Sequence, residues 1–332
     1  MARDADLYSL VADVGGTNTR VALARGPAVQ ADSVRRYANA DFVARGEGLE
    51  AVLGTYVGAM GGVDCRAAAV AIAGPVRDGR GELTNLSWGM DRETLARVTR
   101  AERAEVLNDL QAQGHALADL APGALRPVLA GARPAPGATR LVIGAGTGFN
   151  AAAVFETASG RLVPPAEAGH VTLPMRGGDD LRLGRWLERE VGVAQGFASV
   201  EEVLSGRGLE HVYRWLGAEA GDPAQKPAQE IMAALAKGGD ARAEATARVY
   251  VRTLGNVAGD LALTLLPYGG VYFIGGVVRA MQPFLGRFGF AQAFRDKGRF
   301  GEFMAQFPVW VVEDDYAALT GCASYLAGTA RA

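Results

Sequence analysis

Residues 10–25 read LVADVGGTNTRVALAR, and this stretch predicts a strand, a glycine turn and a second strand. Apolar residues lead into Gly15-Gly16, where φ can become positive without a Cβ clash. From Val21 to Leu23 the alternating, extended pattern resumes. We therefore expect a β-hairpin near the start of the chain.

The predicted turn has the features of a phosphate cradle. Its backbone N–H groups lack strand partners, and the Thr17 hydroxyl and the Asn18 amide lie beside them. Asp13, just before the turn, could face a metal ion on that phosphate. An ordinary hairpin with a Gly-Gly turn explains this stretch equally well, so the choice depends on the rest of the chain.

Composition favours a globular protein of two domains. The chain has 332 residues, 49% hydrophobic and 21% charged, with 34 basic and 36 acidic side chains and a formal charge of -2. This balance does not favour nucleic acid or an acidic membrane surface as a partner. Cys65 and Cys322 lack CxxC spacing, and no signal or membrane-spanning pattern occurs, so we expect a reducing, cytoplasmic location.

Two polar residues follow a short predicted strand in the first third of the chain. Ala67–Ala73 is a continuous apolar run, typical of a strand buried on both faces of an α/β sheet. Glu105–Leu107 is a second strand, and Asn108 and Asp109 lie where it gives way to helical spacing. Ligands bind at the carboxyl ends of such strands, although a helix N-cap is the simpler interpretation of Asp109.

A second stretch repeats the first hairpin. Leu141–Ile143 leads into the glycine-rich residues 144–148, and an apolar segment follows from Phe149 to Phe155. This repetition predicts a duplicated fold. The GxGxxG dinucleotide pattern matches poorly because no clear helix start follows it, although helix propensity alone allows the alanine-rich segment to be helical.

Several polar residues later in the chain are suited to hydrogen bonding with a polyol. Glu167 and His170 lie in a predicted loop, where ordinary surface positions are the simpler interpretation. Glu201 and Glu202 follow Ser199, the expected N-cap of a helix, and first-turn acids are common there.

The last third of the chain predicts a core helix, a buried strand and a final helix. The helix covers 242–266, and the strand Val271–Ile274 ends in Gly275-Gly276. Small residues there let a planar ring or a ribose approach the backbone, while close packing is the alternative. The final helix, about 316–326, is expected to return to the N-terminal lobe.

Taken together, seven motifs resemble those of bacterial glucokinases, in the superfamily of sugar kinases, heat-shock chaperones and actin. They occur in the family's order over nearly the whole chain: ADVGGTNTR, LTNLSW, VLNDL, GAGTGFN, PAEAGH, EEVLSGRGL and FIGGVV. The resemblance implies an α/β, two-lobed, actin-like or ribonuclease H-like duplicated fold with an interlobe cleft. The expected small lobe is 1–119 plus 313–332, and the large lobe is 120–312.

The resemblance also implies roles for individual residues. Asp109 matches the catalytic base, and Asn108, Glu167, His170 and Glu201 match sugar-binding residues. The nucleotide-binding positions are Ala12, Asp13, Val14, Gly15, Gly16, Thr17 and Asn18 in the first phosphate loop, Gly144, Gly146, Thr147 and Gly148 in the second, and Gly275 and Gly276 near adenosine. Asp13 is expected to hold Mg²⁺ through water. Phe149, Asn150 and Ala168 depart from the family pattern, and the first two leave nucleotide placement open.

The implied function is ATP-dependent phosphorylation of D-glucose at O6, giving glucose 6-phosphate, with Mg-ATP bound by the two glycine hairpins. Glucose and ATP are thus the expected partners, without nucleic acid or membrane, and a homodimer is an oligomeric state to test. A kinase of another hexose or an N-acetylhexosamine is the alternative within enzymes. A non-catalytic sugar sensor, or a filament-forming or chaperone-like ATPase, is the alternative outside that class.

Overall fold

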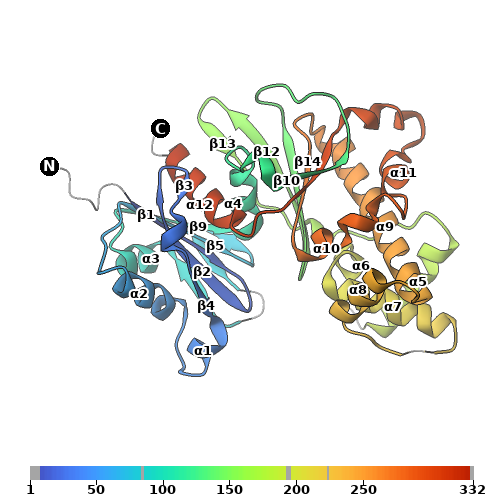
Figure 1. Ribbon diagram of the computed structural model, residues 1–332, viewed down its shortest axis with the longest axis horizontal. Helices are drawn as coiled ribbons and strands as arrows, with labels where there is room; N and C mark the ends of the chain where they lie inside the picture. Colours follow the sequence, from blue (N-terminus) through green and yellow to red (C-terminus); the bar gives the residue numbers. More distant parts are fainter. Residues whose placement is uncertain (1–7, 84–85, 192–195, 223, 330–332) are drawn as a thin grey trace. The chain divides into compact units, whose positions relative to one another are not determined.

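The computed structural model describes residues 8–83, 86–191, 196–222 and 224–329 (Figure 1). Thr84 and Asn85 of the LTNLSW motif lie outside the described residues. The chain forms two compact units. Unit 1 comprises residues 1–122, 154–165 and 314–332, and unit 2 comprises residues 123–153 and 166–313.

The sheet of unit 1 is built around the first hairpin. Its strands are β1 (Ser9–Val14), β2 (Asn18–Arg25), β3 (Ala28–Val29), β4 (Arg35–Ala38), β5 (Ala67–Ile72) and β9 (Arg103–Asn108), in the order β3-β2-β1-β5-β9 with β4 on β2. β1 pairs with β5, and β5 with β9, in parallel. Their register aligns Val14, Ile72 and Asn108 at one end of the sheet, and Ser9, Ala67 and Arg103 at the other.

Helices cover both faces of this sheet, which explains the continuous apolar run in β5. Leu10, Ala12 and Val14 of β1 belong to the core beneath α2 (Leu49–Ala59) and α3 (Arg92–Thr99). Val11, between them in sequence, faces the core shared with α4 (Asp109–Ala116) and α12 (Ala317–Thr329). The expected return of the last helix to the N-terminal lobe is therefore confirmed (Figure 1). The remaining elements of this part are α1 (Asn39–Val43) and the small sheet of β6 (Val76–Arg77), β7 (Arg80–Glu82) and β8 (Gly89–Asp91).

Unit 2 has a second mixed sheet that begins with the second hairpin. Its strands are β10 (Leu125–Leu129), β11 (Arg140–Ala145), β12 (Phe149–Thr157), β14 (Val271–Ile274) and β15 (Val309–Val312), in the order β10-β15-β14-β11-β12. The alanine-rich segment after Phe149 is thus a strand. Its helices are α5 (Gly178–Glu190), α6 (Glu201–Leu204), α7 (Gly206–Glu219), α8 (Ala228–Lys237), α9 (Ala241–Leu265), α10 (Gly276–Leu285) and α11 (Phe290–Arg295).

Residues 154–165 group with unit 1, whereas the expected boundaries put them in the larger lobe. This segment contains the second half of β12 and β13 (Gly160–Leu162). Val154 and Val163 lie against Gly114 of α4, where a Cβ would come within 2.9 Å of the Val163 side chain. The grouping therefore depends on a tertiary contact that local pattern does not reveal.

Two local expectations were wrong. Neither Gly15 nor Gly16 has a positive φ, so the first turn does not require left-handed backbone. Ser199 is not a helix cap either, because α6 begins after Val200 without a side-chain cap. Ser205 instead caps α7, accepting a hydrogen bond from the Gly208 N–H at 3.0 Å. None of the helices in the described part of the chain is both long and apolar enough to cross a bilayer.

The long helix α9 carries two buried glycines where α11 approaches it closely. A Cβ on Gly259 would lie 2.6 Å from the Phe294 carbonyl oxygen, and one on Gly255 would lie 2.9 Å from the Phe290 carbonyl oxygen. Glycine in the middle of a helix usually costs about 1 kcal/mol relative to alanine. Here the missing Cβ allows the two backbones to meet.

We therefore predict that Gly259→Ala destabilises the protein, by about 1–3 kcal/mol, because the added methyl group overpacks this contact. Gly54→Ala is the matched control, since Gly54 is an exposed glycine within α2 and a Cβ there meets no atom within 4 Å. The control should raise the free energy of unfolding by about 0.5–1 kcal/mol. Urea denaturation of both variants measures the change in the free energy of unfolding, which should be negative for Gly259→Ala and positive for Gly54→Ala. An increase in Gly259→Ala would contradict the close packing of α9 and α11.

Candidate active site

The first phosphate loop connects β1 and β2 and is held by a buried side chain from a later segment. The Asn39 amide donates to the Gly15 carbonyl at 2.8 Å, its oxygen accepts from the Thr19 hydroxyl at 2.9 Å, and its backbone N–H donates to the Thr17 carbonyl at 3.0 Å. The loop carbonyls are thereby directed to Asn39. The N–H groups of Gly16 and Thr17 make no hydrogen bond with another described residue, as an anion cradle requires.

Asp13 lies on β1 immediately before this loop. Its Oδ2 accepts from the Arg20 guanidinium at 3.1 Å, and the two residues are direct neighbours across β1 and β2. Burial raises the pKa of Asp13 from its usual value, while the charge and the hydrogen bond of Arg20 lower it. Arg20 therefore favours the ionised carboxylate in a partly desolvated position.

Asn108, and not Asp109, caps the helix that follows β9. The Asn108 side-chain oxygen accepts from the Leu110 N–H at 3.0 Å, and the Gln111 side chain accepts from the Asn108 N–H at 3.2 Å. The Asn108 amide also donates to the Gly74 carbonyl at 2.9 Å. Asp109 is the first residue of α4 and half-buried, and its Oδ1 accepts from the Leu110 N–H at 2.7 Å.

This arrangement distinguishes the sugar-binding role predicted for Asn108 from the catalytic role predicted for Asp109. Asn108 is only 7% exposed, and its cap bonds alone account for its position, so sugar binding by Asn108 stays a prediction. The capping interpretation of Asp109 no longer explains its presence. Asp109 lies beyond the carboxyl end of β9, the side of an α/β sheet at which ligands bind.

The second phosphate loop lies in unit 2, between β11 and β12. The Gly146 N–H donates to the Gly148 carbonyl, and the Gly206 N–H at the start of α7 donates to the Gly146 carbonyl, both at 2.9 Å. Within the described part of the chain, the N–H groups of Thr147 and Gly148 have no hydrogen-bond acceptor. Like the first loop, this one presents backbone donors.

Gly275 and Gly276 lie against the second loop. Gly275 has φ of 120°, and a Cβ there would collide with the Ala145 carbonyl oxygen, so a side chain is excluded twice. A Cβ on Gly146 would lie 3.8 Å from the Gly276 nitrogen. These two glycine segments are therefore neighbours within unit 2.

A cavity of about 540 Å³ opens beside these glycines. Its wall includes the loop residues Gly146 and Thr147, Gly276 of α10, and the apolar side chains Leu209, Met232 and Val277. Its size and its apolar wall fit a planar aromatic base, and the adjoining loop N–H groups fit phosphate oxygens. Phe149 and Asn150 do not line it.

Asn150, one of the two residues here that depart from the family pattern, instead holds the loop that carries Glu167 and His170. The Asn150 amide donates to the Ala166 carbonyl at 2.6 Å, and its oxygen accepts from the Ala168 N–H at 2.8 Å. The Glu167 and His170 residues are exposed, and the His170 N–H donates to the Glu167 carbonyl at 3.2 Å. Asn150 thus ties this polar loop to the end of the second phosphate loop.

In unit 2, the Glu201 carboxylate contacts both the second phosphate loop and the loop that carries Glu167 and His170. Its Oε2 accepts from the Phe149 N–H at 3.0 Å. A Cβ on Gly148 would lie 2.7 Å from that oxygen, and one on Gly169 would lie 3.3 Å from it. The structure therefore brings three predicted site segments of unit 2, those at Gly148, Gly169 and Glu201, into direct contact.

Arg207, Glu202 and His211 form a charged cluster behind Glu201 that sequence reasoning missed. Arg207 Nη2 lies 3.3 Å from Glu201 Oε1 and 3.3 Å from Glu202 Oε1. The buried Glu202 carboxylate also lies 3.1 Å from His211 Nδ1. The close approach of His211 lowers the pKa of Glu202, and the Arg207 charge lowers it further, against the opposing effect of burial.

The EEVLSGRGL motif contains Glu202 and Arg207, but in sequence the two glutamates of the motif are typical of acids in the first turn of a helix. Arg207 follows Glu201 by six residues, across the break between α6 and α7, so regular helical spacing does not pair them.

His115, the third histidine, is buried in α4. Burial and then the Arg161 charge lower its pKa to about 4, so it is a neutral core residue.

Among the described residues, the carboxylate at Asp13 fits a magnesium ion that is also held by phosphate. No group of three or more His, Cys, Asp or Glu side chains able to hold a metal occurs among the residues that the structure describes. Mg²⁺ commonly uses one or two carboxylates together with substrate phosphates and water. Asp13, a single carboxylate beside a phosphate loop, matches that donor set.

Comparisons with known proteins agree with the geometry. The family model described as Glucokinase matches residues 10–329. The protein named glucokinase of Chelativorans sp. (strain BNC1) is 34% identical over 329 residues, covering 98% of this chain and 93% of the relative. The crystal structure of a glucokinase from an Antarctic psychrotroph has a TM-score of 0.81 and 30% identity, covering 96% of this chain and 98% of that one.

The structure of a ROK-family glucokinase from Streptomyces griseus, described as a complex with glucose and AMPPNP, is also similar. It has a TM-score of 0.61 and 18% identity, and covers 96% of this chain and 98% of that one, so it supports the fold alone. Two α/β units, each with a glycine hairpin on a mixed sheet, define the class of two-domain sugar kinases, which confirms the predicted fold class.

Within that class, the chain belongs to the glucokinase family. The resemblance seen in the seven motifs, and the enzyme that it implies, are thereby confirmed at the level of the family. The roles of single residues stay predictions.

Arg207→Gln should raise the KM for glucose about twofold to fivefold and change the KM for ATP little. The substitution leaves the adjacent Glu201 and Glu202 carboxylates without their shared cation, and an ion pair with a solvent-accessible partner contributes about 0.5–1 kcal/mol. Steady-state kinetics with each substrate varied in turn measures the effect.

The control is Arg214→Gln on the same helix, where Arg214 lies 3.7 Å from Glu190. It should leave both KM values unchanged. If Arg207→Gln lowers the melting temperature without changing the KM for glucose, Arg207 has only a structural role.

Proposed function

We propose that this protein transfers the γ-phosphoryl group of ATP to O6 of D-glucose. One observation carries the proposal: in this chain of the glucokinase family, Glu201 contacts the second phosphate loop. The Glu201 carboxylate is suited to sugar hydroxyls, and it contacts the end of a loop whose backbone N–H groups have no partner among the described residues. A polyol site and a phosphate site are thus neighbours within unit 2.

Asp109 acts as the general base in this proposal. A sugar hydroxyl is a poor nucleophile at neutral pH, so a carboxylate must orient it and accept its proton as the phosphoryl bond breaks. Because Asn108 already caps α4, the Asp109 carboxylate is not needed for that task. Its hydrogen bond from the Leu110 N–H, at 2.7 Å, holds it at the start of the helix.

The two phosphate loops stabilise the charge of the transition state. Donors fixed before the reaction are more effective than water, which must reorganise, and Gly16, Thr17, Thr147 and Gly148 supply such N–H groups. Magnesium, when bound, neutralises charge on the phosphate oxygens. Asp13 would hold its water shell, and the Arg20 charge favours the ionised form of that carboxylate against the opposing effect of burial.

Glu167, His170 and Glu201 select the sugar. Asn150 holds the loop of the first two, and Arg207 orients Glu201. A site built to hydrogen-bond a hydroxyl rejects an analogue that lacks it, because the protein group is left unpaired. Magnesium dependence, a cytoplasmic location and a homodimer remain predictions beside this proposal.

A coupled assay of ADP release against a sugar panel tests the proposed reaction. D-Glucose should give the highest kcat/KM, and 6-deoxyglucose should give no turnover above the ATPase background because it lacks the accepting hydroxyl. Another hexose or an N-acetylhexosamine at the head of the panel would replace glucose as the substrate. Binding of glucose without turnover of any sugar would favour a sensor.

Asp109→Asn should lower kcat by roughly 10²–10⁴-fold while the Kd for glucose changes little, because the amide keeps the shape and loses the base. Single-turnover kinetics and calorimetric titration with glucose measure the two quantities separately. Asp119→Asn, a partly exposed carboxylate near the C-terminal end of α4, is a control that should keep its kcat. Near-normal kcat in Asp109→Asn would remove Asp109 from the mechanism.

A further inference from the structure

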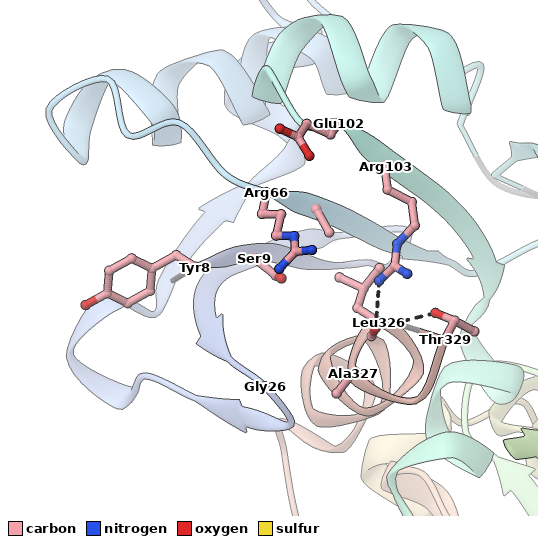
Figure 2. Close-up of a pocket in the computed structure, with 10 residues that line it drawn as sticks. Tyr8, Ser9, Gly26, Arg66, Glu102, Arg103, Leu326, Ala327 and Thr329 are labelled. Carbon is pink, nitrogen blue, oxygen red and sulfur yellow. Dashed lines mark hydrogen bonds between the residues drawn. The ribbon is translucent and has the colours of Figure 1, made fainter. Parts of the chain in front are cut away.

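A second cavity lies entirely within unit 1, at the end of the sheet opposite to Asp13 and Asn108 (Figure 2). It has a volume of about 450 Å³. Ser9, Ala67 and Arg103, which lie in register on β1, β5 and β9, form one wall. The last residues of α12 form another. It contains no residue of the candidate active site.

Two arginines direct their charges into this cavity. Figure 2 shows the guanidinium groups of Arg66 and Arg103 facing the same space above α12. Arg103 Nη2 donates to the Leu326 carbonyl at 2.6 Å. The Arg66 side chain makes no hydrogen bond or ion pair with any residue that the structure describes.

The acidic residue nearest in sequence forms no ion pair with either arginine. This residue, Glu102, also lines the cavity (Figure 2). No ion pair joins Glu102 to a described residue. Two cations facing one space repel each other, and an anion between them removes that repulsion.

The facing wall has the opposite hydrogen-bonding character. The Leu326 carbonyl, which accepts from Arg103, and the Thr329 side chain lie on the helix side of the cavity. The Thr329 hydroxyl donates to the Tyr325 carbonyl at 2.8 Å, so its oxygen remains an acceptor. The cavity therefore has cationic donors on the strand side and neutral acceptors on the helix side.

From this polarity we infer that the cavity binds a phosphate monoester of a small polyol. The planar guanidinium groups match the oxygens of a phosphate and can each donate two hydrogen bonds. Hydroxyl groups at the other end of the same molecule would donate to the acceptors of α12. The volume is in the range of small-molecule sites.

A purely structural role explains one of the arginines and not the other. Arg103 caps a carbonyl of α12, and this bond alone would hold it in place. Arg66 makes no such bond with a described residue, yet its side chain points into the same space (Figure 2). The inference is independent of the proposed reaction, because the two sites occupy opposite ends of the strands.

Calorimetric titration with glycerol 3-phosphate tests the inference, with the active site filled by saturating glucose and AMPPNP. The wild-type protein should bind one equivalent. Arg66→Gln should weaken that binding at least about tenfold, since hydrogen bonds to a charged group are lost. Arg97→Gln is the matched control, because Arg97 is an exposed arginine of unit 1 paired with Glu50 at 3.0 Å.

The kcat for glucose should be the same in wild type, Arg66→Gln and Arg97→Gln. Absence of binding to the wild type up to about 10 mM, a concentration that detects even millimolar affinity, would overturn the inference. An unchanged Kd in Arg66→Gln would overturn it as well. Equal affinity for inorganic phosphate would overturn the assignment of a polyol ester.

Discussion

The parallel register of β1, β5 and β9 is the constraint on which the rest of unit 1 depends. Because Val14, Ile72 and Asn108 end their strands side by side, the phosphate loop after β1 and the helix after β9 leave the sheet from one edge. A shift of one residue in a strand would turn each of its side chains to the other face. Burial of both faces, under α2 and α3 and under α4 and α12, makes such a shift costly.

In unit 2 the corresponding constraint is close backbone approach. Gly275 meets Ala145, Gly169 meets the Phe149 carbonyl, and Gly148 meets the Glu201 carboxylate, each at a distance that excludes a side chain. The glycines therefore do more than make turns, because they allow Glu201 to contact two loops at once. Arg207 then provides the counter-charge for Glu201 and the buried Glu202.

Most of the strands and helices could be predicted from the sequence because their signals are local. The alternation around Val21, the apolar run at Ala67–Ala73 and the stop at Pro267 each reflect the burial or the hydrogen bonding of nearby residues. The family motifs extended this to the site, since they indicated Glu201 and the Glu167 loop without any knowledge of their contacts.

The supporting residues could not be predicted in this way. Asn39 holds Gly15 from 24 positions away, and Phe149 and Glu201 are 52 positions apart. Such contacts have no local period or spacing, so Asn39 reads as an ordinary polar residue before a short helix. The choice between Asn108 and Asp109 as the cap of α4 was ambiguous for another reason, since both are good N-cap residues.

The crystal structure of the protein with glucose, Mg²⁺ and AMPPNP is the most direct test of this account. The account predicts the Asp109 carboxylate within hydrogen-bond reach of the glucose O6, about 2.6–3.2 Å. It also predicts phosphate oxygens on the N–H groups of Gly16, Thr17, Thr147 and Gly148. Glucose with O6 facing another group, or phosphates bound away from both loops, would contradict it.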